Sequence, residues 1–186
     1  MAYQQHWTFP AELQPKGSDV AFDLARALDA VVAMRVEVAD DAFTASVLGT
    51  ERRGNGVVID DGLVLTNGYL ITEAESIWIT THSGNVVPGH ALAYDAVTGL
   101  GLVMPLGKLG VPSIPRSNLE SADVDDDVYV IGNGGRGHAL RARLFARREF
   151  AGYWGYLRDG GLFARPPQPE WSGGALREAS GGGKGV

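Results

Sequence analysis

From residue 31 onward the chain consists of short apolar runs separated by turn residues, and this pattern constrains its fold more than any other feature. The runs are rich in β-branched residues and are bounded by clusters of Gly, Asn and Asp. We predict that eight of them form strands: MRVEVA, FTASVLGT, GVVID, LVLTN, SIWITTH, LGLVMPL, DVYVIGN and ALRARLFA. Many short strands at this spacing favour an all-β sandwich or barrel.

Turn residues and one helical pattern fill in the rest of the expected organisation. Asp60-Asp61-Gly62 and His82-Ser83-Gly84-Asn85 are predicted to turn two hairpins. The Gly- and Pro-containing stretch 106–118 is expected to connect two β units. Before the strands, apolar residues recur every three or four positions from Phe22, and Ser18 is a suitable N-cap. This predicts one helix over about 18–30.

Composition excludes several classes of function. The chain has 16 basic and 22 acidic residues, a formal charge of −6, so no bulk attraction to nucleic acid or anionic lipid is expected. It has no cysteine, which excludes disulfides and a thiol nucleophile. No histidine–carboxylate spacing suggests a metal site, and no cofactor is predicted.

The N-terminal sequence, MAYQQHWTFPAELQPKGSD, has neither a basic region nor a continuous apolar stretch, so it is not a secretory signal. A cytoplasmic location is therefore expected, or a periplasmic one if the chain is a processed form. Nor does any stretch approach the roughly 18 apolar residues of a membrane span.

Four sequence pieces, in order, resemble motifs of the HtrA (DegP) family of trypsin-like serine proteases. They are Gly54-Asn55-Gly56-Val57-Val58-Ile59-Asp60, Leu65-Thr66-Asn67-Gly68-Tyr69-Leu70, Asp95-Ala96-Val97-Thr98-Gly99-Leu100-Gly101-Leu102 and Trp171-Ser172-Gly173-Gly174-Ala175-Leu176. The run Asp127–Asn133 is similar to a further strand of the family. The resemblance covers roughly residues 45–180, and it depends on the order and spacing of the pieces together.

The resemblance implies two six-stranded antiparallel β-barrels packed side by side, with a cleft between them. We divide the chain accordingly into an N-terminal arm and helix (1–32), a first barrel (33–108) and a second barrel (109–186). Family members continue after the serine motif with two more strands that close the second barrel. Here only Ala175–Glu178 and a Gly-rich tail follow, so we expect that barrel to be incomplete, the chain being a fragment or another segment filling the gap.

Two of the three catalytic positions implied by the resemblance carry residues that do not fit the family's chemistry. Ser172 stands at the nucleophile position, Tyr69 at the histidine position and Gly99 at the aspartate position. A serine nucleophile needs an imidazole to take its proton and a carboxylate to orient that imidazole. A phenol is a donor at neutral pH and hence a poor general base, and glycine offers no side chain.

The oxyanion loop also departs from the family. The resemblance implies backbone donors at Ser172 and at the residue two before it, which is Glu170 rather than glycine and is followed by Trp171. A non-glycine residue does not readily adopt the required backbone conformation, and a carboxylate opposes the developing anion. Losing one such donor costs about 100- to 1000-fold in rate.

The residues at these positions can be explained by a purely structural role as well as by a functional one. Ser172 is either a turn residue of a Ser-Gly-Gly loop, a reactive nucleophile or a ligand contact. Tyr69 is either a packed aromatic or a hydroxyl that bonds Ser172 and blocks the cleft. A replacement base would have to come from the remaining histidines, none of which falls at a motif position: His6, His82, His90 and His138.

An arginine-rich segment, 136–148, is followed by several aromatic residues. A nucleic-acid patch has this composition, but so does a two-stranded hairpin with one solvated face, which the acidic run Asp123–Asp127 would pair. The negative overall charge favours the hairpin, and exposed aromatics with Arg also suit a protein-binding surface.

The sequence therefore predicts a protease-fold protein that is catalytically inactive and acts as a binding or regulatory module. The expected partner is a protein or peptide, with a second copy of the chain as a further option, rather than nucleic acid or membrane. The alternative is a serine hydrolase that uses Ser172 with a non-standard base or one from another chain. A peptide-binding module of the PDZ type, common in the family, would lie beyond residue 186.

Overall fold

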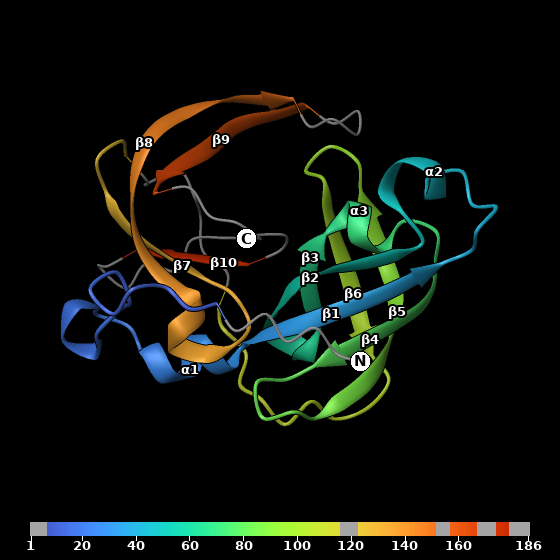
Figure 1. Ribbon diagram of the computed structural model, residues 1–186, viewed down its shortest axis with the longest axis horizontal. Helices are drawn as coiled ribbons and strands as arrows, with labels where there is room; N and C mark the ends of the chain where they lie inside the picture. Colours follow the sequence, from blue (N-terminus) through green and yellow to red (C-terminus); the bar gives the residue numbers. More distant parts are fainter. Residues whose placement is uncertain (1–6, 116–122, 152–156, 167–173, 179–186) are drawn as a thin grey trace.

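The computed structural model of the protein describes residues 7–115, 123–151, 157–166 and 174–178. Two β units make up most of it, one a closed barrel and the other a curled sheet (Figure 1). This confirms the all-β, double-barrel expectation with the second barrel incomplete. Ser172, Glu170, Trp171 and His6 lie outside the described residues.

The first unit is a closed barrel with strand order β1-β2-β3-β6-β5-β4, all neighbours antiparallel. Inward side chains alternate with outward ones, as Val36 and Val38 do on either side of the less buried Glu37. The inward set forms a core cluster that includes Val36, Ile79 and Val103. Its elements are β1 (Val31–Val38), α2 (Ala45–Leu48), β2 (Glu51–Val58), η2 (Asp60–Gly62), β3 (Val64–Asn67), α3 (Gly68–Ile71), β4 (Ala74–Thr80), β5 (Val86–Asp95) and β6 (Leu100–Pro105).

The second unit is a four-stranded antiparallel sheet with the order β10-β7-β8-β9. Val128, Leu140, Ala142 and Leu144 form its buried cluster, against which Phe9 and Leu13 of the N-terminal arm pack. The elements are β7 (Asp127–Ile131), η4 (Gly135–His138), β8 (Ala139–Ala151), β9 (Leu157–Arg165) and β10 (Ala175–Glu178). In Figure 1, β8 and β9 arch together over this side of the molecule.

A shared apolar cluster joins the two units. It combines Val31 and Val57 of the barrel with Ile131 and Ala175 of the sheet, and Ile114 of the connection packs there too. Asn133 adds polar contacts across the same junction: its N–H donates to Asn55 Oδ1 at 2.9 Å, and its side-chain amide donates to the Val31 carbonyl at 3.1 Å.

The N-terminal helix is shorter than the sequence predicts. A 3₁₀ turn, η1 (Gly17–Asp19), is followed by extended backbone at Val20, and α1 spans only Leu24–Asp29. Asp23, not Ser18, is its N-cap and accepts the Arg26 N–H at 3.0 Å. In the segment that leads into the helix, the Phe22 ring packs edge-on against the Tyr129 ring, with 6.1 Å between the ring centroids.

The prediction of a strand at FTASVLGT is wrong, because Ala45–Leu48 forms the helical turn α2. The Glu73 carboxylate accepts the N–H groups of Phe43 and Thr44, at 3.0 and 2.8 Å, just before this turn. Amides at the start of a helix have no partner within it, so a distant acceptor stabilises the helical conformation. Gly49, at φ +78°, ends the turn. Within the described residues, no helix is both long and apolar enough to cross a membrane.

Candidate functional site

Two of the sequence motifs meet at the end of the first barrel. Strand β3 pairs with β6 in the register Asn67↔Leu100, and the Gly68 N–H donates to the Gly99 carbonyl at 2.8 Å. Tyr69 is the next residue along α3, so the positions that the resemblance assigns to the histidine and the aspartate lie side by side. The third position, Ser172, is outside the described residues, as are Glu170 and Trp171.

Gly99 closes a tight turn that needs no side chain at this position. Its φ is +70°, in the left-handed region that favours glycine, and its N–H donates to the Asp95 carbonyl at 2.8 Å. The Asp95 carboxylate accepts the Thr98 hydroxyl at 2.7 Å and the Val97 N–H at 3.0 Å. These bonds, led by that from Thr98, lower the pKa of Asp95. Asp95 is therefore occupied in holding the turn.

Close packing at two glycines brings α3 onto the barrel wall. A Cβ on Gly68 would lie 2.0 Å from the Tyr94 ring, and one on Gly101 would lie 2.7 Å from Ile71 Cδ1. Both distances are shorter than carbon atoms tolerate, so only glycine fits without movement. Tyr94, about half exposed at 49%, thus lies directly against the residue that precedes Tyr69.

Tyr69 itself is part of the barrel's packing. Its side chain is partly buried against the first-barrel core cluster. Its carbonyl accepts a hydrogen bond from Arg52 Nη1 at 2.7 Å. The packing of the side chain agrees with the interpretation of Tyr69 as a packed aromatic, and the alternative, a hydroxyl that bonds Ser172, involves a residue outside the described parts of the chain.

Arg52 is the residue at this site that the sequence analysis missed. It is only 3% exposed, and its guanidinium donates to three backbone carbonyls and to the Thr44 hydroxyl. The carbonyls are those of Gly49, Tyr69 and Thr72, at 3.2, 2.7 and 2.8 Å respectively. Arg52 thereby satisfies C-terminal carbonyls of α3 that the helix cannot bond itself. No local pattern indicates its burial, because a charged residue on a strand is ordinarily exposed.

Glu73 completes the network around Arg52. Besides the N–H groups of Phe43 and Thr44, its carboxylate accepts the Thr44 hydroxyl, whose oxygen also accepts from Arg52 Nη2 at 2.7 Å. The Thr44 hydroxyl and amide bonds are the main causes that lower the pKa of Glu73. Glu73 has a φ of +59°, unusual for a non-glycine residue, and the network holds it there. The loop carrying α2 is thus fixed to α3.

Two of the three described histidines, His82 and His138, lie together away from this site. His82, after β4, and His138, at the end of η4, both lie against the Gly134-Gly135 turn, and the Trp7 ring packs on His138 at 4.7 Å. Burial, and secondarily His82, lowers the pKa of His138. His90 is on β5 opposite Met104. None of these three has a described contact with Tyr69 or Gly99.

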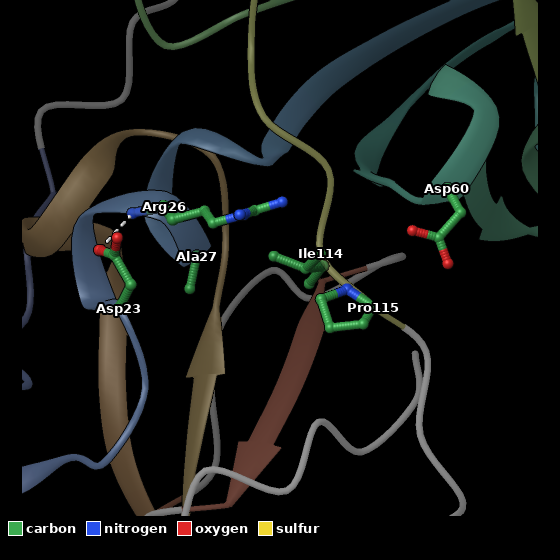
Figure 2. A pocket seen from close by; sticks show the side chains of 6 residues that line it. All are labelled: Asp23, Arg26, Ala27, Asp60, Ile114 and Pro115. Carbon is green, nitrogen blue, oxygen red and sulfur yellow. Dashed lines mark hydrogen bonds between the residues drawn. The ribbon is translucent and has the colours of Figure 1, made fainter.

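A separate hollow of about 260 Å³ lies at the junction of the two units (Figure 2). Two of its polar residues already have roles: Asp23 caps α1, and Arg26 Nε donates to the Ser113 carbonyl at 2.9 Å. The sequence analysis did not predict this hollow. Its lining residues are Asp23, Arg26, Ala27, Asp60, Ile114 and Pro115. Across the described parts of the chain, no group of three His, Asp or Glu side chains is placed to hold a metal ion.

The chain is similar to proteins of a known family. The family model of the trypsin-like peptidase domain matches residues 54–182 of this chain. The serine endoprotease DegS of Haemophilus influenzae is 33% identical over 81 residues, which are 43% of this chain and 24% of DegS. The putative serine protease HhoA of Synechocystis sp. is 29% identical over 120 residues, covering 56% of this chain and 30% of HhoA. The chain therefore spans less than a third of these relatives.

Solved structures share the fold. The Rv3671c protease of M. tuberculosis in an inactive form superimposes with a TM-score of 0.66 at 22% identity, covering 89% of this chain and 81% of that one. The HtrA-type protease AlgW with a tripeptide gives a TM-score of 0.67 at 17% identity, covering 91% of this chain and 52% of that one.

Proposed function

Because the chain belongs to the trypsin-like peptidase family, with relatives of the HtrA type, we propose that it uses this fold to bind a protein or peptide and does not hydrolyse peptide bonds. The observation that carries the proposal is the pair of residues at the end of the first barrel. Tyr69 and Gly99 stand where the resemblance places the general base and the group that orients it.

The local geometry supports the loss of both chemical roles. The Tyr69 side chain packs against the barrel core, and Gly99 occupies a left-handed turn. The nearby Asp95 carboxylate is engaged with Thr98 and Val97 and so does not replace the missing acid. When two members of a triad are missing, an otherwise intact site retains only about 10³- to 10⁴-fold acceleration over water.

The same region offers a surface for a ligand. Tyr94 lies against Gly68 with half of its side chain exposed, and Leu92 and Val97 nearby in sequence are 48% and 77% exposed. An exposed tyrosine is a frequent anchor of protein-binding surfaces. We therefore place the binding role of the module at this end of the first barrel, with Tyr94 as its main contact.

Labelling by a serine-directed fluorophosphonate, together with casein hydrolysis at neutral pH, tests the loss of catalysis. We expect neither labelling nor hydrolysis by the unmodified protein. Ser172→Ala is the diagnostic variant, and Ser46→Ala, which changes an exposed serine on α2, is its control. Labelling that disappears in Ser172→Ala and persists in Ser46→Ala would overturn the proposal and favour a hydrolase with a non-standard base.

A further inference from the structure

The outer face of β8 carries a row of arginines around an exposed aromatic ring. Arg141, Arg143 and Phe145 alternate with the buried Ala142 and Leu144, so they point away from the sheet's apolar cluster. The register of β8 with β9 places Arg165 beside Arg143. We call Arg141, Arg143, Phe145 and Arg165 the arginine face.

The hairpin formed by β8 and β9 is positively charged, whereas the rest of the chain is negatively charged. Residues 139–165 contain six arginines and two acidic residues, a formal charge of +4, whereas the other residues together carry −10. Such a division gives the hairpin a local positive potential on a protein that is negative overall. An anionic partner is therefore attracted to this face and repelled by the remaining surface.

The arginine face is ordered by contacts of its own. Arg141 Nη2 lies 2.7 Å from Asp127 Oδ2, and Arg143 Nε lies 3.6 Å from Asp127 Oδ1. One carboxylate is thus shared by two guanidinium groups, and both arginine side chains remain more than half exposed, at 51% and 63%. Donors that face solvent are left over for a second carboxylate.

Phe145 orients the third guanidinium. The register of β8 against β9 shifts between Leu144 and Ala146, which leaves Phe145 at a bulge and 40% exposed. The Arg165 guanidinium carbon lies 4.2 Å from the centroid of the Phe145 ring, and Phe163 packs against Phe145 at 6.2 Å. A guanidinium stacked on a ring loses less conformational freedom when it binds a carboxylate, so this arrangement favours binding.

We propose that the arginine face is a docking surface for an acidic segment of a protein partner. A short run of carboxylates complements three arginines while covering little of the negative remainder of the chain, of which Asp125, Asp126 and Asp127 lie beside β8. A long polyanion such as nucleic acid would extend onto that remainder and be repelled. Arg165 also covers one face of Phe145, where a base would have to stack. This surface lies on β8 and β9 and does not depend on the role proposed for Tyr69 and Tyr94.

The test measures binding of a fluorescein-labelled peptide of alternating Glu and Thr, about twelve residues long, by fluorescence anisotropy at low salt, where charge interactions are least screened. We expect Arg143→Glu with Arg165→Glu to weaken binding about tenfold or more. The matched control is Arg53→Glu on β2, whose side chain is 62% exposed and ion-paired to Glu51, much as Arg143 is 63% exposed and paired to Asp127. It should change binding less than about twofold.

Two further measurements make the result decisive. Phe145→Leu keeps an apolar side chain but removes the ring beneath Arg165, and should weaken peptide binding by about threefold. If the double variant does not fold, Arg165→Gln alone serves in its place. An unchanged affinity in the arginine variants, an equal loss in Arg53→Glu, or tighter binding of an oligothymidine of similar length would each overturn the proposal, the last in favour of nucleic acid.

Discussion

The six strands of the first barrel pair in a closed ring, whereas the described strands of the second unit form an open order with β10 and β9 at its two ends. The barrel buries a cluster of thirteen apolar residues drawn almost wholly from its own strands and α3. The sheet has a cluster of four, and residues of the N-terminal arm pack against it. The barrel is therefore stabilised by its own side chains, and the sheet by segments from elsewhere in the chain.

The two units also treat polar side chains differently. Arg52, Thr66 and Thr81 are buried in the barrel and hydrogen-bonded, as Thr66 is to the Asn55 carbonyl at 2.7 Å. The sheet instead carries its arginines on its outer face. Removing a polar group from the barrel should thus cost stability, while removing one from the sheet should change what the protein binds.

The largest expected effect comes from breaking the buried network of the barrel. Arg52→Ala removes hydrogen bonds to three carbonyls and Thr44 and leaves these acceptors without their donor. We expect the free energy of unfolding to fall by about 3 kcal/mol or more. In urea denaturation the exposed neighbour Arg53→Ala should cost under about 0.5 kcal/mol. Similar losses for the two variants would show that the barrel does not depend on this network.

Removing the arm's apolar contacts should have a smaller and more local effect. Phe9→Ala with Leu13→Ala is expected to lower the free energy of unfolding by about 2 kcal/mol, since both side chains are only partly buried. Hydrogen exchange at the Arg141 amide, which donates to the Leu13 carbonyl at 2.8 Å, should accelerate more than exchange in β1. Phe43→Ala, at a side chain 91% exposed, is the control and should change neither. Equal acceleration in β1 would contradict the separate dependence of the sheet.

Acidification should weaken the junction between the units by a modest amount. Burial disfavours the charged form of His138 and is the main reason that its pKa lies below the ordinary 6.5. Its contribution to stability is therefore present above pH 6.5 and is lost as the pH falls through the lower, folded-state pKa. Chemical denaturation at pH 7 and pH 5 should show a smaller difference in His138→Asn than in the unmodified protein. His90→Asn, on the outside of the barrel, should keep the full difference; if His138→Asn kept it too, another group would be responsible.

The smallest expected effect is that of restoring the two side chains alone. Tyr69→His with Gly99→Asp should give no gain in fluorophosphonate labelling, because Glu170 and Trp171 remain in the oxyanion loop. Adding Glu170→Gly and Trp171→Asn is expected to be necessary for any reactivity of Ser172. If the double variant labelled as fast as the quadruple one, the oxyanion loop would be intact and the inactivity would rest on the two positions in the barrel.

Local patterns allowed most of the barrel to be predicted from sequence. Turn residues such as Asp60-Asp61-Gly62 act through their own backbone preferences, and the β2–β3 hairpin follows from them. The meeting of the Tyr69 and Gly99 motifs followed from the resemblance and agrees with the Gly68–Gly99 hydrogen bond. Each of these features depends on residues close together in the sequence or on a known order of motifs.

The missed features depend on contacts between distant residues. FTASVLGT has the composition of a strand, but Glu73, about thirty positions away, supplies the acceptor before the α2 turn. Arg52 is charged, and charged residues are almost always predicted to be exposed; only the fold shows four partners around it. The hollow beside α1 likewise joins Asp23 with Ile114 and Pro115, which no local pattern connects.

The bond between Gly68 and Gly99 runs from main chain to main chain, so neither side chain at the two altered positions is needed to hold the turn together. The turn itself therefore needs neither an imidazole nor a carboxylate, whereas the packing of Tyr69 and the positive φ of Gly99 suit the residues that are present. Peptide hydrolysis by a serine, in contrast, requires both groups, so the barrel can form where that reaction does not occur. A family fold is for this reason inherited more durably than the reaction it first supported, and activity must be argued from side chains, position by position.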